Sequence, residues 1–239
     1  MRIMDIHCHL LPHVDDGAKN LQESAEMIRM LWEQGVRTII ATPHYRKGMF
    51  EPSMEMVQTQ LMHVRRVARK VSRDIKIYLG CEFHVNMDMP WILSDGERPT
   101  LAGSSYVLSE FADSVQESYM RERIQTLRGF GYTPVIAHIE RYQKIIRNEE
   151  FVAELSAAGA KIQVDAETIL KRNPKIKRFC RWLIMEDLLD FIGSDAHSVQ
   201  RRAPCMGACR EYLVKKCGKA YARKIMEENP EQILRERKF

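Results

Sequence analysis

The chain has 239 residues, of which 45% are hydrophobic and 29% are charged, and its formal net charge is +5. This composition is typical of a globular protein and argues against a disordered chain, and so mild a positive charge, spread along the sequence, does not indicate nucleic-acid binding. No signal-peptide pattern precedes the first apolar run, and no stretch approaches about 18 uninterrupted apolar residues, so we expect a cytoplasmic protein without membrane insertion. The six cysteines show no Cys-x-x-Cys spacing and are interpreted as reduced thiols.

Short apolar runs alternate with helical patterns along the chain. The first run, residues 3–7, precedes a helix over 21–34, where Asn20 and Glu23 resemble a capping box and Gly35 ends the pattern. Further strands are expected at 36–41, 75–81, 106–109, 134–137, 161–164 and 190–193. Further helices are expected at 52–71, near Trp91, and at 116–128, 148–158, 175–187, 204–216, 219–228 and 230–237.

Seven strands separated by helices predict parallel βα units, which form either a closed barrel or an open, doubly wound sheet. The barrel is favoured because polar side chains follow the C-terminal ends of successive strands, and in a barrel those ends converge on one mouth. An open sheet would spread the same side chains along one edge. These strand-end residues are His7, His9, His44, Glu82, Glu110, His138, Asp195 and His197.

The residue types at the strand ends indicate a metal site. His7 and His9 stand two positions apart on an extended segment, so their imidazoles lie on one face within about 7 Å and can bind one cation. Carboxylates mixed with imidazoles, without thiolates, suit Mn, Fe or Zn in a catalytic site. The candidates are too many for one ion, so two or three metals with a bridging carboxylate are expected, and paired metals about 3.5–4 Å apart are used in phosphate-ester hydrolysis.

Six motifs, taken in order, carry a resemblance to a known family. They read DIHCH at 5–9, LPHVDDG at 11–17, ATPH at 41–44, GCE at 80–82, HIERY at 138–142 and GSDAH at 193–197. Together they resemble the polymerase-and-histidinol-phosphatase (PHP) superfamily, and within it the bacterial manganese-dependent protein-tyrosine phosphatases of capsule and exopolysaccharide operons. The resemblance implies a distorted seven-stranded (βα)7 TIM-like barrel with a trinuclear site, in which residues 1–239 form one phosphatase domain.

The resemblance also implies roles for individual residues. Three metals are each implied to have their own ligands, with Glu82 as a bridge, and Arg141 is implied to bind the phosphoryl oxygens, since a planar guanidinium can pair with two of them. The first metal is assigned His7, His9 and Asp195, the second Glu110 and His138, and the third Asp16, His44 and His197. Mn is the implied metal, with Fe, Zn or Mg as alternatives.

The implied reaction is hydrolysis of phosphotyrosine by a metal-activated hydroxide. The implied partner is a tyrosine-phosphorylated protein, namely the tail of a bacterial tyrosine kinase that regulates capsule synthesis, and a homo-oligomer is compatible with the sequence. A tyrosyl leaving group has a pKa near 10, so the need for a strong general acid is modest.

Several residues next to the motif positions have other expected roles. We expect Asp5 to orient a ligand histidine from behind and Cys8 to point away from the metals into the packed interior. His13 is either an extra ligand or an exposed loop residue. The basic residues Arg46, Lys47, Arg201 and Arg202 either attract the phosphopeptide or are solvated surface charges.

Three other functions deserve a test. Cys217 and Arg223 have the Cys-x5-Arg spacing of cysteine-dependent tyrosine phosphatases, but the segment between them is not glycine-rich and has a helical pattern, so we reject this interpretation. A small-molecule phosphomonoesterase, similar to histidinol phosphatase, is the alternative within the superfamily. A metal-stabilised interaction module without activity is the alternative outside enzymes.

Overall fold

The computed structural model describes residues 1–171 and 173–237 of the chain. Its strands are short and mostly buried, and most of them start or end close to the predicted positions. In chain order they are β1 (Ile3–Cys8), β2 (Val36–Ala41), β3 (His44–Tyr45), β4 (Lys76–Leu79), β5 (Glu82–His84), β6 (Tyr106–Glu110), β7 (Thr133–Ile136), β8 (Lys161–Asp165) and β9 (Phe191–Gly193).

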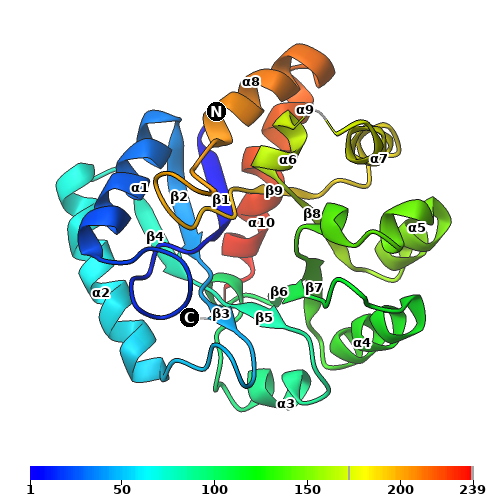
Figure 1. The fold of residues 1–239 in the computed structure, drawn as a ribbon, viewed down its shortest axis with the longest axis horizontal. Helices are drawn as coiled ribbons and strands as arrows, with labels where there is room; N and C mark the ends of the chain where they lie inside the picture. The colour runs from blue at the N-terminus through cyan, green and yellow to red at the C-terminus, as the bar shows by residue number, and fades with distance from the viewer. Residues whose placement is uncertain (172, 238–239) are drawn as a thin grey trace.

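The strands pair in parallel as two curled sheets, with the orders β1-β2-β4 and β3-β5-β6-β7-β8-β9. At the far edge of the larger sheet, Asp195 N donates to His7 O at 2.8 Å and His9 N donates to Ala196 O at 2.9 Å, which links the segment after β9 to β1. Figure 1 shows the resulting curl of strands. The predicted α/β class with parallel strands is confirmed. The predicted single seven-stranded barrel is not, because the described strands pair as two sheets.

The strand predicted at 75–81 is shorter in the structure, where β4 ends at Leu79 and a second strand, β5, begins beyond the predicted range at Glu82. The break between them falls at Gly80, where an added Cβ would lie 2.8 Å from Leu101 Cδ2 and 2.9 Å from Ile40 Cγ2, so only glycine allows this close approach. The neighbouring chain breaks at the same level, between β2 and β3, at Pro43, which has no N–H for a sheet hydrogen bond. Beyond these two breaks β3 and β5 resume the pairing of β2 and β4 in the same register, with His44 opposite Glu82.

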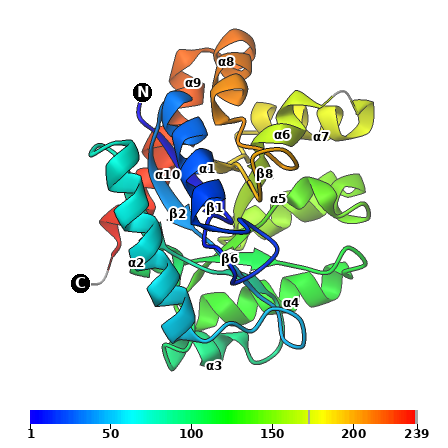
Figure 2. The same ribbon diagram turned by 60° about the vertical axis from the view of Figure 1, so that its left-hand side comes forward.

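All described helices except α10 lie outside the strands, as Figure 1 shows, and Figure 2 shows α1 and α2 next to each other on that outer side. The helices are α1 (Leu21–Glu33), α2 (Met54–Val71), α3 (Met89–Ser94), α4 (Glu117–Gly129), α5 (Glu149–Ala157), α6 (Ala166–Leu170), α7 (Pro174–Met185), α8 (Met206–Cys217), α9 (Lys219–Arg223) and α10 (Asn229–Arg235). Short 3-10 turns occur at Leu101–Gly103, Ile139–Arg141 and Ile145–Arg147, and a π-helical turn at Lys224–Glu228 precedes α10.

The N-terminal capping signal predicted for the first helix is partly confirmed. At the start of α1, Asn20 Oδ1 accepts from Glu23 N at 2.9 Å, as the capping box predicts. The Glu23 carboxylate, however, accepts from Lys19 N at 2.9 Å and not from Asn20. Helix α6 was not predicted, because its five residues are too few to show a helical period.

Two apolar layers support the site. The outer layer packs the helices against the strands and includes Cys8, which points away from the histidines beside it as expected. The inner layer lies inside the curl and includes Met4, Ile6, Leu108 and Ile233. Ile233 belongs to α10, which crosses the middle of the ring in Figure 1. Among the described residues, no helix is long and apolar enough to span a membrane.

Candidate metal centre

The structure brings all nine predicted metal ligands together at the carboxyl ends of the strands. Parallel strands deliver them there because their C-terminal ends share one edge of the sheet. The residues are His7 and His9 at β1, Asp16 in the following loop, His44 in β3, Glu82 in β5, Glu110 at the end of β6, His138 after β7, and Asp195 and His197 after β9.

The deepest group consists of His7, His9, Glu82 and Asp195, whose ligand atoms all lie within 4.8 Å of one another. Glu82 Oε2 is 3.1 Å from both His7 Nε2 and His9 Nε2. Asp195 Oδ1 lies 3.3 Å from His7 Nε2 and 3.4 Å from His9 Nε2. All four side chains are buried, so this group matches the predicted first site with its bridging carboxylate.

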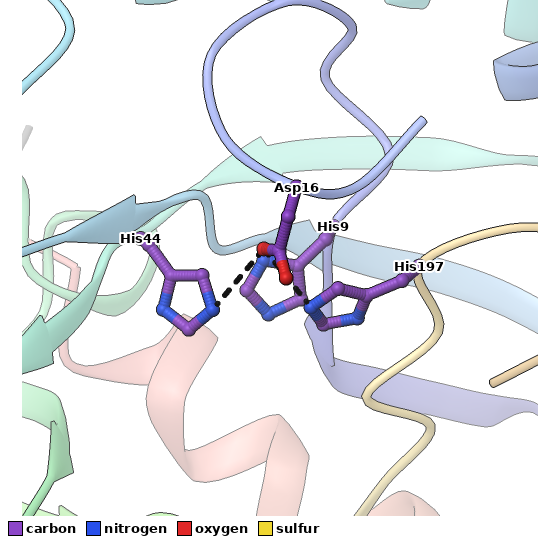
Figure 3. A group of neighbouring side chains, drawn as sticks. All are labelled: His9, Asp16, His44 and His197. Atoms are coloured by element: carbon purple, nitrogen blue, oxygen red, sulfur yellow. Dashed lines mark ion pairs between the residues drawn. The ribbon is translucent and has the colours of Figure 1, made fainter. Parts of the chain in front are cut away.

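A second, more exposed group consists of His9, Asp16, His44 and His197, shown in Figure 3. Asp16 Oδ1 is 3.5 Å from His44 Nε2 and 3.5 Å from His197 Nε2. The Asp16 side chain is 53% exposed, which places this group at the opening of the site. It contains the three residues predicted for one metal and adds His9, which therefore belongs to two groups.

A third group consists of His44, Glu82 and Glu110. His138 adjoins it, with its Nε2 at 2.9 Å from Glu82 Oε1 and 3.7 Å from Glu110 Oε1. The predicted pair of Glu110 and His138 is thus brought together, and His44 lies with it. Glu82 thus belongs to the deepest group and to this one, with Oε2 facing His7, His9 and His44 and Oε1 facing His138.

The loop after β1 is shaped so that Asp16 reaches the site. Asp15 Oδ2 lies 2.7 Å from His9 Nδ1 and accepts from His44 N at 2.9 Å, which ties the loop to two ligand-bearing segments. At Gly17 an added Cβ would lie 2.2 Å from His9 O, so no other residue allows this approach. The VDDG motif therefore has a structural reason: one aspartate orients His9 and the next faces the opening.

The residues that orient His7 were not predicted. Gln163 Oε1 in β8 lies 3.2 Å from His7 Nδ1 and accepts from His138 N at 2.8 Å. Asp5, which we expected to orient an imidazole, instead accepts from the backbone N–H groups of His7 at 3.3 Å and Ser194 at 2.9 Å. Asp5 thus fixes the β1 backbone against the segment after β9, and Gln163 contacts the imidazole itself.

Two guanidinium groups converge on Asp195. Arg141, in the turn after β7, pairs with Asp195 and with Asp165, the latter at 2.5 Å, and its side chain is 37% exposed. Arg202, in the loop before α8, also pairs with Asp195 and donates to His197 Nε2 at 2.8 Å. Arg141 therefore lies where it was predicted, and Arg202 is a site residue that the sequence left open.

The positions of the other residues with open roles are as follows. His13 is exposed and has a left-handed backbone with φ +64°. Arg46, Lys47 and Arg201 are exposed, and Lys47 pairs with Asp88 at 2.8 Å. His84, which was not predicted, lies with its Nδ1 at 3.1 Å from Glu110 Oε2.

The cysteine and arginine of the rejected alternative lie outside this site. Cys217 ends α8, and burial raises the pKa of its thiol, which disfavours the thiolate that such chemistry needs. Arg223 pairs with Glu228 at 3.1 Å and with Glu227 at 3.4 Å.

Unpartnered buried atoms show that the residues fit a cation. Within residues 1–171 and 173–237, Glu82 Oε2, Asp195 Oδ1 and His138 Nδ1 are buried without a hydrogen-bond partner. A buried carboxylate oxygen of this kind costs several kcal/mol unless a charge partner or a metal compensates it. Carboxylate oxygens grouped with imidazole nitrogens are the donor set of Mn, Fe and Zn.

The carboxylates of the site are held in their ionised form. Burial alone would raise the pKa of Glu82, but the His7 and His44 rings beside it outweigh burial and hold it well below the usual range. The pKa of Asp195 is lowered well below its usual range in the same way, with burial opposed chiefly by His7.

The imidazoles fall into two classes. Burial would lower the pKa of His7, but Glu82 and Asp195 raise it, whereas burial leaves the pKa values of His44 and His197 lowered. Burial would also lower the pKa of His138, but the hydrogen bond that its ring donates to Glu82 outweighs burial and raises this pKa to about 9. The inner carboxylates thus favour the protonated form of His7 and His138, with which a cation competes, whereas burial favours the neutral, metal-binding form of His44 and His197.

Comparison with protein families gives a match over nearly the whole chain. The model of the capsular polysaccharide synthesis family CpsB/CapC matches residues 3–235. The tyrosine-protein phosphatase CpsB of Streptococcus pneumoniae is 35% identical over 240 residues, which cover 97% of this chain and 98% of that protein. The tyrosine-protein phosphatase YwqE of Bacillus subtilis is 33% identical over 203 residues, which cover 84% of this chain and 79% of that protein.

Comparison with solved structures gives the same result. A chain from the crystal structures of B. subtilis YwqE and S. pneumoniae CpsB, described as unique metal-dependent tyrosine phosphatases, superimposes with a TM-score of 0.90 and 30% identity, covering 99% of this chain and 96% of that one. The phosphotriesterase homology protein of Escherichia coli superimposes with a TM-score of 0.62 at 11% identity and covers 97% of this chain and 98% of that one, so this likeness concerns the fold alone.

Proposed function

This chain belongs to the CpsB/CapC family of capsular polysaccharide synthesis, and on that premise we propose that it hydrolyses phosphotyrosine in proteins with metals held by the nine residues at the strand ends. It is a metal-dependent protein-tyrosine phosphatase. The observation that carries the residue assignment is the overlap of three ligand groups that share His9, His44 and Glu82.

The proposal assigns two to three divalent ions to these groups, with Mn as the metal and Fe, Zn or Mg as alternatives. Glu82 and Asp195 would anchor the deepest ion with His7 and His9. Asp16, His44 and His197 would hold the most exposed one, and Glu110 and His138 the remaining one. When bound, such ions supply Lewis acidity and lower the pKa of a coordinated water to about 7.

The protein's own cations have a separate task. Arg141 and Arg202 stand at the opening, each about one-third exposed, so both can reach an incoming phosphoryl group. A guanidinium pairs with two phosphoryl oxygens at once and stabilises charge that develops on them. Asp165, which contacts Arg141 at 2.5 Å, holds that side chain in place for this role.

The proposed substrate is a tyrosine-phosphorylated protein, namely the tail of a bacterial tyrosine kinase that regulates capsule and exopolysaccharide synthesis. Exposed Arg46 and Lys47, one and two residues beyond β3, supply positive charge beside the opening for acidic residues of such a tail. We also propose the cytoplasm as the compartment, in line with the six free cysteines. The closed seven-stranded barrel, the single domain over residues 1–239 and the homo-oligomer stay predictions.

The test combines elemental analysis with turnover of a phosphotyrosine peptide. The metal-loaded protein should hydrolyse the peptide, a chelator should abolish turnover, and His7→Ala should lose metal. Arg141→Ala should keep its metal and lose turnover, while Cys217→Ser should match the wild type. Turnover of histidinol phosphate in preference to the peptide would favour the small-molecule alternative. A metal-loaded protein inert toward both would favour the interaction module.

A further inference from the structure

A small, well-fixed turn stands beside the opening of the metal centre. Arg46 N donates to Phe50 O at 2.9 Å and Phe50 N donates to Arg46 O at 2.8 Å, which closes the turn as a short antiparallel bridge. Gly48 at its tip has φ +78°, and its N–H donates to Glu51 Oε1 at 2.7 Å. The turn is therefore held by its own hydrogen bonds, in a shape that requires glycine at the tip.

The last residue of this turn packs on a candidate ligand. The Phe50 ring stacks on the His44 imidazole, with ring centroids 5.3 Å apart and ring planes 11° from parallel. Phe50 is only partly buried, so some of its ring stays accessible beside the site. The preceding residue, Met49, is 60% exposed. Residues 49–50 thus form an apolar lip next to a histidine of the most exposed ligand group.

The apolar lip contrasts with the rest of the opening. The other accessible side chains named there are all polar or charged, namely Asp16, His84, Glu110, Arg141 and Arg202, with Arg46 and Lys47 beside them. These groups suit cations and phosphoryl oxygens. An apolar surface among them has no role in binding phosphate, so it suits the part of the substrate that carries no charge.

We propose that Phe50, assisted by Met49, forms the subsite for the aromatic ring of the substrate, an inference that rests on the phosphatase function proposed above. In an aryl phosphate only the ester oxygen separates the ring from phosphorus. When the phosphoryl group reaches the ligands around His44, the ring must lie beside His44 as well, where Phe50 packs. Aromatic pairs and sulfur–aromatic contacts favour this arrangement.

The same geometry explains selection of phosphotyrosine over phosphoserine. A seryl ester has one methylene group between its oxygen and the peptide backbone, so it cannot cover the apolar lip while its phosphoryl group is at the metals. A phenyl ring covers the lip and keeps the peptide backbone farther out. Selectivity then arises because the apolar surface of residues 49–50 stays exposed to solvent in the phosphoserine complex and is buried in the phosphotyrosine complex.

The test uses Phe50→Leu, which keeps apolar bulk, and Phe50→Tyr, which keeps the ring. Steady-state kinetics with a phosphotyrosine peptide should show KM raised about 3- to 10-fold in Phe50→Leu, the fold-change expected for loss of an aromatic pair, and nearly unchanged in Phe50→Tyr. Inorganic phosphate has no ring, so its inhibition constant should stay within about twofold of the wild-type value in both variants, as should metal content measured by elemental analysis.

Met49, the exposed neighbour of Phe50, allows a second test with a matched control, because its truncation does not disturb the stacking on His44. Met49→Ala should raise KM for the peptide, whereas Met62→Ala should not, because Met62 is 59% exposed but lies on α2, about two turns beyond its first residue. An unchanged KM in Phe50→Leu and Met49→Ala overturns the subsite. The subsite is also overturned if the KM of Phe50→Leu changes only together with its phosphate inhibition constant and its metal content. In that case Phe50 would merely support His44. Absence of wild-type turnover would instead overturn the phosphatase function.

Discussion

Replacing Glu82 by glutamine is the sharpest test of the shared-ligand arrangement. Glu82 is buried, and its two oxygens lie within 3.1 Å of four imidazole nitrogens, those of His7, His9, His44 and His138. The amide keeps the shape of the side chain but removes its charge, and it can turn an N–H₂ group toward these nitrogens. Among the carboxylates of the three ligand groups, Glu82 alone belongs to two.

The expected loss of metal affinity in Glu82→Gln follows from the burial of Glu82. Removing one partner from a buried charged set costs about 3–5 kcal/mol, which corresponds to a loss of about 10²- to 10⁴-fold in metal affinity. Competition with a chelating dye measures this affinity, and elemental analysis after dialysis gives the metal content. Turnover of a phosphotyrosine peptide should fall in parallel.

Glu110→Gln is the matched control, because Glu110 is a carboxylate of the same site that belongs to one group and is 19% exposed. It should lose less affinity than Glu82→Gln, and the metals held by the other groups should remain. If Glu82→Gln retains full metal content and turnover, or loses no more than Glu110→Gln, then Glu82 does not bridge and the grouping is wrong.

Three further predictions concern residues around the ligands. Arg202→Ala should lower kcat/KM by about 10- to 100-fold, the loss expected for hydrogen bonds to charged groups, whereas its exposed neighbour Arg201→Ala should stay near wild type; equal effects would refute the assignment of Arg202. Asp15→Asn should weaken metal binding by about 10- to 100-fold through the orientation of His9, and unaltered binding in a titration would contradict this. Burial, with Asp165 nearby, raises the pKa of Glu140 to about 8, so its contribution to stability is complete below about pH 4.5 and is lost as the pH rises through 8. Thermal unfolding of the metal-free protein should therefore find Glu140→Gln more stable than wild type at pH 9 but not at pH 4.5, and a constant difference across this range would exclude the predicted linkage.

Local patterns determined most of the elements. Asn20 caps α1, and the alternation of His7 and His9 around Cys8 sends both imidazoles to one face, because each depends only on backbone geometry over a few residues. The parallel α/β class follows from the alternation of strand and helix patterns. Eight of the nine candidate ligands were found because they lie at or just past the ends of predicted strands, a property of single segments that the chain displays in order, and Asp16 was found through the family resemblance.

Other features depended on contacts between distant segments. The sixth predicted strand, at 161–164, had no strand-end candidate, and the structure fills that place with Gln163, which contacts His7, and Asp165, which holds Arg141. That missing candidate could have directed attention to the end of the sixth strand. The break at Gly80 left no comparable signal in the sequence, because it results from the side chains of Ile40 and Leu101 packing closely against one position.

The sequence by itself predicted which side chains gather at the candidate metal centre, whereas the tertiary structure decided which of them lie together. His9, His44 and Glu82 each lie in two ligand groups, and Arg202, whose role the sequence left open, reaches Asp195 from the loop before α8. Strand ends give the residues a common edge, but the curl of the sheets sets the distances across it. Those distances, of 2.9 to 3.7 Å between groups on different strands, arise only when the whole chain has folded.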